Sequence, residues 1–514
     1  MSKFNQTRNA RAATSPVQSK RKAAATTHQG GQAYMRDAKG ELFTLAVSNM
    51  VSEKTFYEDS IDRDSRYRDL IHTVAYCDPD WTRRFLKWLR TEANMRSASL
   101  VGGLEAARAL NQAELPGGRQ IVDAVMVRAD EPGEALAYWT ARYGRRIPKS
   151  VKRGIADAVL RLYRQRSFLK WDSAKSQFRF ADVLQLVHPS TSDAAQDALF
   201  SHILDERYGN GNDIPNQLGM LRSNQFLRHL TIEDPAVLFN SSALSKAGMT
   251  WEDVLSLAGD KLDKRKLWEA VIPSMGYMAL LRNLRNFDQA GVSDEVAETV
   301  TAKLTDPEEV KRSRQFPFRF LAAYQAAPSL RWSYPLEKAL GSSLANVPEL
   351  PGRTLIMVDR SMSMRAPMSD RSDLTAGDSA AIFGTALALR AERPTLVQFG
   401  SSSQEIDVKP GTSVLRVMDS YEWLGGTDTA GAIRKHYSGH DRVVIVTDEQ
   451  ANYWGGDPAR YVPDNVPVYT WNLVGYRYGH APSGENNRHT FAGLTDKAFS
   501  MIPLLEHKAG EWPF

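Results

Sequence analysis

From about residue 42 to residue 348, apolar residues recur at three- and four-residue spacing, as in Phe85, Leu86 and Leu89. This spacing is typical of helices buried on one side, and short groups of Gly, Pro, Asn and Asp separate the segments. Strand-like alternation is almost absent. So many short helices over a long stretch favour a stack of helical pairs over one compact bundle.

The pattern changes after a junction at residues 346–353, which contains Pro348, Pro351 and Gly352. Short runs rich in β-branched and aromatic residues then alternate with helical segments. Strands are expected at 354–358, 395–399, 443–447 and 466–474, and a helix with small residues on one face is expected at 374–391. This order predicts a mostly parallel sheet flanked by helices, with any ligand beyond the carboxyl ends of the strands.

Charge separates the two parts. Residues 352–514 contain 16 Lys and Arg against 19 Asp and Glu, a net charge of −3, so the total of +5 leaves +8 on the residues before them. A polyanion would therefore bind the helical part. Residues 1–39 are rich in Ala, Ser, Thr and Gln, so we expect a disordered basic arm, either a solubilising tail or an arm for nucleic acid. Its charged residues are Lys3, Arg8, Arg11, Lys20, Arg21, Lys22, Arg36 and Lys39, against Asp37.

Cys77 is the single cysteine, which excludes an intrachain disulfide and a zinc site built from several cysteines. No uncharged apolar run approaches the ~20 residues that cross a bilayer. The first residues lack the apolar core of a secretory signal. We therefore expect a soluble protein of the reducing cytoplasm, with no membrane partner.

Three short motifs predict a metal site. Asp359, Ser361 and Ser363 form D-x-S-x-S directly after the first expected strand, Thr427 lies in a Gly-rich loop before a helix, and Asp448 follows another strand. Hydroxyl and carboxylate oxygens suit a hard divalent cation, Mg²⁺ or Mn²⁺, far better than zinc. Ordinary turn residues that bond their own backbone are the alternative, but three pieces in matching contexts favour the ion. Together they resemble the metal-ion-dependent adhesion site of von Willebrand A domains.

Catalysis is disfavoured at this site. Phosphotransferases of the haloacid dehalogenase type resemble D-x-D-x-[TV], whereas the second acidic position here is Ser361. Neither a G-x-S-x-G elbow nor a G-x-x-x-x-G-K-[ST] loop occurs. Two-metal nucleases need several bridging carboxylates, which this hydroxyl-rich set lacks. We expect no catalytic residue.

The helical part contains a dense basic segment, made of Arg145, Arg146, Lys149, Lys152 and Arg153. Like charges at this density repel one another without a polyanion. Further along, helical spacing places apolar residues on one face of the segment 277–287 and Arg282, Asn283, Arg285 and Asn286 on the other, where they could donate to phosphates. Tryptophans such as Trp81, Trp88, Trp139 and Trp171 are expected in the core rather than as base-stacking platforms.

Several segments resemble the TROVE module of the Ro proteins. They are Y-G-R-R-x-P-K at 143–149, D-V-L-x-L-x-H-P at 182–189, A-L-L-R-N-L at 279–284 and Phe316-Pro317-Phe318 beside Arg319. The family's Gly-rich aromatic segment is reduced to residues 54–58 here, so no RNA contact is assigned to this segment. The resemblance implies a multidomain α plus α/β protein. After the arm 1–39, residues 40–348 would form a ring of HEAT-like repeats, closed by a Rossmann-like von Willebrand A domain at 352–514.

The resemblance also implies a function. Family members bind small structured Y RNAs on the outer surface and pass single-stranded 3′ ends of misfolded RNAs through the central hole, and bacterial relatives cooperate with exoribonucleases in RNA decay. The matched RNA contacts are Lys170, His188, Arg282 and Asn283, supported by Arg145, Arg146, Lys149, Lys152, Arg153 and Arg319. His188 has an equal alternative as a turn residue before Pro189. A ring closed within one chain implies a monomer.

A second hypothesis remains open at this stage. The chain could be a protein-interaction module whose metal site grips an acidic residue of a partner, with the helices as a platform only. The basic helical part favours the RNA-binding scaffold.

Overall fold

The computed structural model describes residues 14–514 apart from 21, 49–50, 210, 212, 261, 328, 345–346, 370–373, 410, 454–456 and 508–510. The first arm of helices consists of α1 (Ala38–Ala46), α2 (Ser60–Cys77), α3 (Pro79–Thr91), α4 (Arg96–Gln112), α5 (Gly118–Ala124), α6 (Glu131–Tyr143), α7 (Lys149–Leu162), α8 (Gln165–Trp171), α9 (Phe180–Val187) and α10 (Ala194–Tyr208). The base consists of α11 (Gly219–Glu233), α12 (Ser241–Lys246), α13 (Trp251–Ala258) and α14 (Lys264–Val271). The returning arm consists of α15 (Tyr277–Ala290), α16 (Asp294–Thr305), α17 (Pro307–Ser313), α18 (Pro317–Ala326) and α19 (Leu330–Ser343).

Amphipathic spacing explains why these segments are helical. In α3, Trp81, Phe85 and Leu89 are buried in the core, while the charged residues between them are exposed. The carboxylate of Asp78 accepts a hydrogen bond from the backbone N–H of Trp81 at 3.0 Å and so caps the first turn. The predicted helical architecture over residues 42–348 is confirmed.

The C-terminal part begins at the predicted junction with β3 (Leu350–Asp359). It continues with α20 (Ala376–Arg390), β4 (Ala391–Phe399), β5 (Ser403–Ile406), α21 (Val414–Met418), α22 (Thr429–His436), β6 (Arg442–Thr447), β7 (Val468–Asn472), β8 (Tyr478–Gly479), β9 (Arg488–Ala492) and α23 (Met501–His507). The main sheet has the order β5-β4-β3-β6-β7-β9 and is parallel except for β5. The predicted alternation of strands and helices is confirmed, and β5 and β9 are additional strands.

The central strands β3 and β6 contain the apolar runs 355–358 and 443–446, because both of their faces are covered. Ile356 and Val358 of β3 belong to the core that includes α20, whereas Leu355 and Met357 belong to a second core with α22. Gly384 lets α20 approach this sheet closely, since a Cβ there would lie 2.2 Å from Val358 Cγ2. Asp359 therefore emerges at the carboxyl end of a rigid strand.

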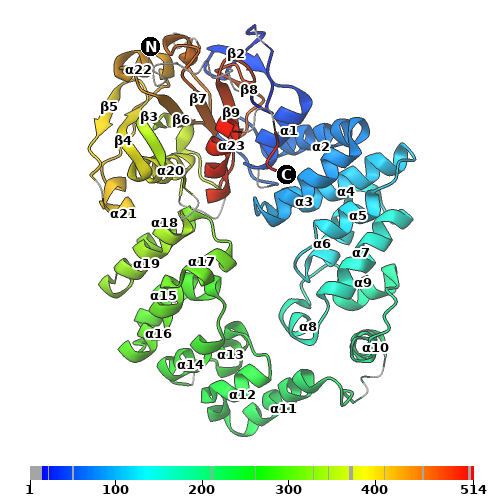
Figure 1. The fold of residues 1–514 in the computed structure, drawn as a ribbon. Helices are drawn as coiled ribbons and strands as arrows, with labels where there is room; N and C mark the ends of the chain where they lie inside the picture. Colours follow the sequence, from blue (N-terminus) through cyan, green and yellow to red (C-terminus); the bar gives the residue numbers. More distant parts are fainter. Residues whose placement is uncertain are drawn as a thin grey trace, which may run out of the picture.

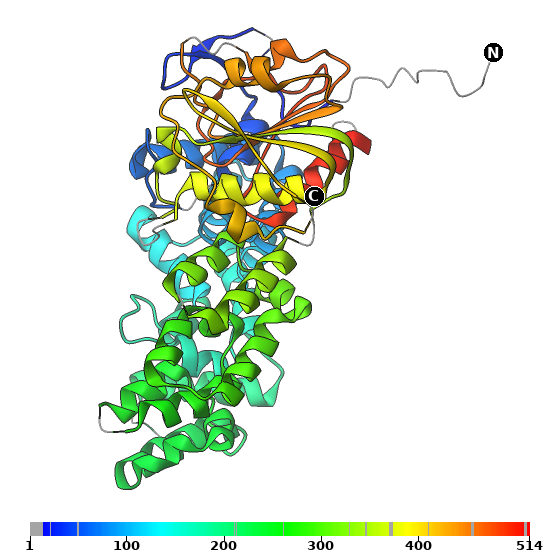
Figure 2. The same cartoon turned by 90° about the vertical axis from the view of Figure 1, so that its left-hand side faces the viewer.

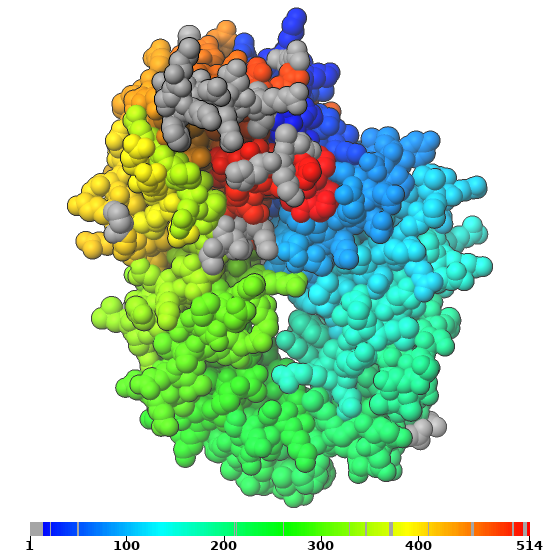
Figure 3. All heavy atoms as spheres, in the orientation of Figure 1, coloured from blue at the N-terminus to red at the C-terminus, as the bar shows by residue number. Residues whose placement is uncertain are grey.

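The two arms and the C-terminal domain form a closed ring (Figure 1). The space-filling view shows an opening between the arms (Figure 3). The side view shows the helices stacked beneath the sheet (Figure 2). On one side the ring closes where α18 contacts α20 and α19 contacts α21; on the other, α1 contacts β9. Among the described helices, none is long and apolar enough to cross a membrane.

The prediction of a disordered arm over residues 1–39 is wrong for its described part. Residues 25–26 and 32–35 form β1 (Ala25–Thr26) and β2 (Gln32–Met35), and β2 pairs with β8. Val17 is fully buried, and Ser19 N donates to Ser483 O at 2.9 Å. Backbone pairing with distant residues supplies the order that composition does not indicate. Lys3, Arg8, Arg11 and Arg21 lie outside the described residues.

Candidate nucleic-acid interface and metal centre

The five predicted metal ligands lie together at one edge of the sheet. Asp359 ends β3, and Asp448 directly follows the neighbouring parallel strand β6. Ser361 and Ser363 follow Asp359, and Thr427 lies just before α22. The five side chains belong to residues that are at most 1% exposed. Carboxyl ends of adjacent parallel strands thus bring these oxygens together, as the sequence predicted.

Hydrogen bonds orient these oxygens and leave one of them unused. Ser361 N donates to Asp359 Oδ1 at 2.9 Å, Thr447 Oγ1 donates to Asp359 Oδ2 at 2.6 Å, and the Ser361 and Ser363 hydroxyl oxygens lie 3.2 Å apart. Asp448 Oδ1 accepts from Gln450 N at 3.0 Å. Within the described residues, no donor meets the buried Oδ2 of Asp448 in hydrogen-bonding geometry, although the Ser363 hydroxyl lies near enough to lower the pKa of this carboxyl. A buried carboxylate oxygen without a donor is costly unless a cation meets it.

Electrostatics agree with a cation. Burial, together with the negative charge of Asp359, raises the pKa of Asp448 to about 7, and burial raises the pKa of Asp359. The neighbouring Arg360 lowers the pKa of Asp359 by its charge, but its ion pair, 3.5 Å long, is with Asp378, and its guanidinium carbon stacks 3.9 Å from the centroid of the Trp423 ring. Two carboxylates and three hydroxyls in this arrangement fit a hard divalent ion.

The described residues offer no cluster of three or more His, Cys, Asp or Glu side chains that could hold a metal. The next acid along the chain, Glu449, forms an ion pair with Arg36 and accepts a hydrogen bond from Asn472. Both contacts use Oε2 of Glu449, whereas its buried Oε1 has no hydrogen-bond partner among the described residues. The site has the carboxylate-poor composition that the sequence indicated.

Two residues that sequence reasoning missed reach this site from the N-terminal region. Gln29 Nε2 donates to Thr427 Oγ1 at 3.1 Å and to the Tyr57 hydroxyl at 3.0 Å. The Tyr57 hydroxyl is also hydrogen-bonded to Ser363, and burial raises its pKa. Two neighbouring glycines, Gly30 and Gly31, were the signal in the sequence, because such pairs mark places where backbones approach closely.

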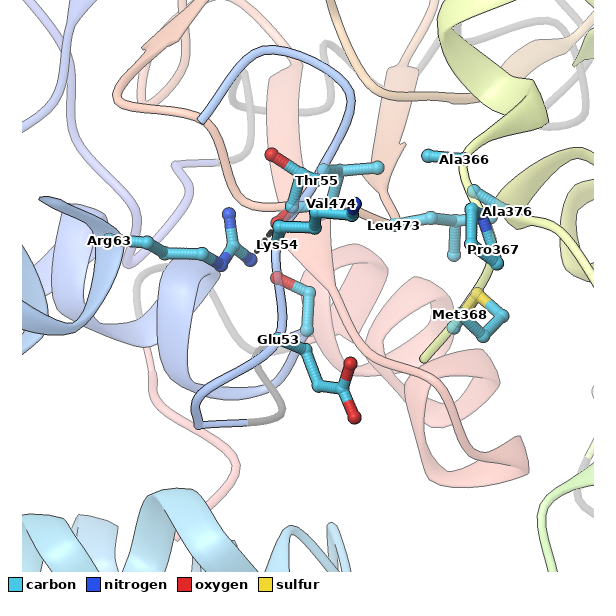
Figure 4. Close-up of a pocket in the computed structure, with 11 residues that line it drawn as sticks. Glu53, Lys54, Thr55, Arg63, Ala366, Pro367, Met368, Ala376, Leu473 and Val474 are labelled. Carbon is cyan, nitrogen blue, oxygen red and sulfur yellow. Dashed lines mark hydrogen bonds between the residues drawn. The ribbon is translucent and has the colours of Figure 1, made fainter. Parts of the chain in front are cut away.

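A small pocket lies beside the metal site, where the first helical arm meets the C-terminal domain (Figure 4). Glu53 and Thr55 line one side, and Pro367 and Met368 line the other. Arg63 is buried at its edge and donates to the backbone carbonyl of Val474. This contact fixes α2 against the sheet domain, so the pocket belongs to the ring closure.

The predicted RNA contacts fall into two groups. Lys170, Arg282 and Asn283 line one hollow of about 240 Å³, formed by α8, the start of α13, and α15. Arg166 and Trp171 line it as well, with Glu252 as the one carboxylate among its described lining residues. Residues about a hundred positions apart in sequence are therefore brought together by the curvature of the ring.

Trp171 packs against the core, as predicted for the tryptophans, and also lines the hollow. Trp81 and Trp139 are buried, whereas Trp88 and Trp171 are half-buried. The Arg128 guanidinium carbon lies 4.4 Å and the Lys170 amine 4.9 Å from the centroid of its indole ring. These cations hold an aromatic face at the rim of the hollow.

Asn283 corrects the prediction for α15. Arg282, Arg285 and Asn286 are exposed as expected, whereas Asn283 is 3% exposed. Its Nδ2 donates to Ala279 O at 2.8 Å, and its Oδ1 accepts from Asn286 at 2.7 Å. Asn283 thus lines the hollow, but both ends of its side-chain amide are hydrogen-bonded to residues of the same helix.

Arg319 lies close enough to Arg282 for their charges to interact. Burial lowers the pKa of Arg319, and the positive charge of Arg282 lowers it further. Among the described residues no salt bridge is found for either arginine, and no carboxylate is among the causes of the Arg319 pKa shift, so the two positive charges lie together.

The second group is the basic segment 145–153. Arg145, Arg146, Lys149 and Arg153 are exposed and Lys152 is half-buried, on the loop before α7 and its first turns. No ion pair joins any of them to another described residue. Other arginines of this arm are paired, as Arg119 is with Asp157 at 2.6 Å. His188 is exposed and ends α9 in the left-handed backbone conformation. Its backbone N–H donates to the Leu184 carbonyl oxygen.

Comparisons with known proteins agree with this geometry. The TROVE domain family model matches residues 238–368. Telomerase protein component 1 of Mus musculus is 42% identical over 83 residues, which are 16% of this chain and 3% of that protein. RNA-binding protein RO60 of Deinococcus radiodurans is 26% identical over 355 residues, 64% of this chain and 62% of that protein. The chain therefore spans less than two thirds of these relatives.

A solved structure extends the likeness to nearly the whole chain. The crystal structure of the Deinococcus radiodurans RO (RSR) protein aligns with a TM-score of 0.62 at 17% identity, and covers 91% of this chain and 99% of that one. At this identity the match concerns the fold. Residues 238–368 therefore match the TROVE domain, and the chain as a whole has the fold of the Deinococcus radiodurans RO protein.

Proposed function

We propose that this chain is a non-catalytic RNA-binding scaffold that holds the single-stranded 3′ end of an RNA in the hollow between α8, α13 and α15. The observation that carries the proposal is that Arg166, Lys170 and Arg282 line the same hollow as the half-buried indole of Trp171. Cations beside an aromatic face bind single strands with little sequence choice, because every nucleotide offers a phosphate and a stacking surface. RNA binding by the Deinococcus radiodurans relative supports the same reading.

The basic segment 145–153 forms a second surface in the proposal, for a small structured, Y-like RNA. Arg145, Arg146, Lys149, Lys152 and Arg153 gather within one loop and the start of one helix. Their unpaired charges would contact phosphates, which position an RNA without reading its sequence. His188 and Arg319 remain supporting contacts in this proposal.

The scaffold would act in RNA quality control or decay, with cleavage left to a partner such as an exoribonuclease. A metal-dependent nuclease would need more carboxylates than Asp359 and Asp448 provide. Because the ring closes within one chain, we propose that it acts as a monomer. The reducing compartment that a single exposed cysteine favours is the cytoplasm.

Mg²⁺ or Mn²⁺ is the cofactor we propose for the sheet edge. Asp359, Ser361, Ser363, Thr427 and Asp448 would hold it, directly or through water. The ion would supply the positive charge that two buried carboxylates lack. An acidic partner residue at this site is the weaker alternative, because all five ligands are covered by the chain itself.

Filter binding tests the RNA proposal. The probes are a hairpin RNA with a single-stranded 3′ tail and the same hairpin without it, each titrated at several salt concentrations. Arg282→Glu should weaken binding of the tailed RNA at least tenfold, whereas Arg145→Glu combined with Arg146→Glu should weaken both probes. Arg434→Glu, an exposed arginine on α22 at the other end of the molecule, is the matched control. Equal binding by all variants would refute the proposal.

A further inference from the structure

Residues 27–31 lie across the residues that follow metal ligand Asp448. Thr27 Oγ1 donates to Ala451 O at 2.6 Å, and His28 N donates to Gln450 Oε1 at 2.9 Å. Gly30 forms a β-bridge with Asn452. These hydrogen bonds hold the loop 27–31 against residues 450–452, which follow Asp448 in the sequence.

Close approach of the backbones makes the fit specific to glycine. A Cβ at Gly31 would lie 2.5 Å from Ala451 O and 2.6 Å from Asn452 O. The Gly31 N–H donates to Thr27 Oγ1 at 2.9 Å, so one hydroxyl joins the loop to itself and to the metal-site loop. No larger residue fits this position without separating the two loops.

The loop directs one side chain among the metal ligands. The Gln29 amide nitrogen lies 3.1 Å from Thr427 Oγ1 and 3.0 Å from the Tyr57 hydroxyl. That hydroxyl is in turn hydrogen-bonded to Ser363 and feels the charges of Asp448 and Asp359. The Gln29 amide thus lies between two oxygen atoms: Oγ1 of the candidate ligand Thr427 and the hydroxyl of Tyr57.

We propose that Gln29 supplies its side-chain oxygen to the divalent cation at this site. The loop 27–31 then takes the place that an acidic group of a partner protein would need. Hard cations accept amide oxygens as ligands, and a half-turn of the amide exchanges its nitrogen for its oxygen at the same position. The inference rests on the proposed metal site, and it makes the ion's last ligand internal to the chain.

An ion bound in this way would hold the ring closed, a role called here the metal clasp, because it would link the N-terminal segment to the C-terminal domain. Tyr57 lies just before α2, and its ring stacks on His28 with centroids 4.8 Å apart. Arg36, at the end of the same N-terminal segment, pairs with Glu449 beside the site. Bound metal would therefore tie the N-terminal segment and the start of the first arm to the C-terminal domain, rather than recruit another protein.

Two measurements on the full chain test this role. The first is the affinity for Mn²⁺, followed by the loss of the free-ion electron paramagnetic resonance signal. The second is trypsin cleavage after the exposed Lys22, with Mg²⁺ or with chelator. Gln29→Ala should weaken Mn²⁺ binding about tenfold and abolish the protection by Mg²⁺, while Gln29→Glu should retain both. Gln32→Ala, at the neighbouring exposed glutamine, is the matched control.

The outcomes separate the two proposals. Mn²⁺ binding and Mg²⁺-dependent protection that are equal in Gln29→Ala and Gln32→Ala would overturn the clasp and leave the metal site intact. A wild-type chain that binds no Mn²⁺ would overturn the metal site as well. Circular dichroism in chelator, compared between Gln29→Ala and the wild type, shows whether the variant is folded.

Discussion

The indole of Trp512 packs on the ring of Phe43, with centroids 5.2 Å apart, although the two residues stand near opposite ends of the sequence. Phe43 lies in α1, and Trp512 also contacts Trp81 of α3. This aromatic contact joins the residues after the sheet to the first helices. It is one of the places where the ring is closed.

Trp512→Ala should lower the free energy of unfolding by about 1 to 3 kcal/mol, since it removes part of an aromatic core shared by two parts of the ring. Thermal unfolding followed by calorimetry measures the change. Tyr334→Ala, at an aromatic residue that is 70% exposed, is the control. Equal melting temperatures for the two variants would show that this contact does not support the ring.

Trp171→Ala should weaken binding of a single-stranded 3′ tail by about 1 to 3 kcal/mol, because one base loses its stacking surface. Trp171→Phe should retain most of the affinity. The salt dependence of binding should stay unchanged, since no charge is removed. Fluorescence anisotropy with a labelled tail gives both quantities.

Phe226→Ala removes an exposed aromatic side chain of α11 that does not line the hollow. Its affinity should equal that of the wild type. If both alanine variants bound alike, Trp171 would have only a structural role.

Asp448→Asn should make thermal stability independent of Mg²⁺. The buried carboxylates of Asp359 and Asp448 repel each other in chelator, so the variant should then be at least as stable as the wild type. With the ion at about 100 times its Kd, the wild type should gain about 2.7 kcal/mol. Differential scanning fluorimetry with Mg²⁺ and with chelator tests both statements.

Asp407→Asn, at an aspartate whose side chain is 81% exposed, should keep the Mg²⁺-dependent gain. A gain of equal size in Asp448→Asn would place the ion elsewhere.

His489 should make the chain sensitive to acid. It is buried, its ring stacks on Tyr469 with centroids 5.1 Å apart, and burial together with Arg488 lowers its pKa to about 4. The fold therefore favours the neutral ring. This contribution is complete above the unfolded pKa of about 6.5 and is lost as the pH falls from there toward 4.

Between pH 7 and pH 4.5 the wild type should lose about 2 kcal/mol more stability than His489→Phe, as measured by denaturant unfolding. His229→Phe, at an exposed histidine, is the control. Identical pH profiles for wild type and His489→Phe would contradict the burial of a neutral ring.

The α/β alternation and the grouping of the five candidate metal ligands at the sheet edge could be predicted because their signals are local. A parallel strand such as β6, covered on both faces, contains an unbroken apolar run at residues 443–446, and the carboxylate that follows the strand must emerge at the edge of the sheet. Asp359 and Asp448 then meet because their strands are neighbours.

The N-terminal segment could not be predicted in this way. Its order comes from hydrogen bonds to residues more than four hundred positions away, such as Thr27 to Ala451, and its composition resembles that of disordered chains. Lys170 and Arg282 line the same hollow because of the curvature of the whole ring. No local sequence pattern predicts that curvature. Asn283 was misplaced because a polar residue on a helix can bury its amide by bonding the preceding turn.

Photo-crosslinking tests the central claim most directly. A hairpin RNA with 4-thiouridine in its 3′ tail is bound to the full chain and irradiated, and the linked peptides are identified by mass spectrometry. We expect crosslinks within α8, the start of α13 and α15, and we expect them to be lost when the tail is removed. Crosslinks confined to the segment 145–153 or to the C-terminal domain would contradict it.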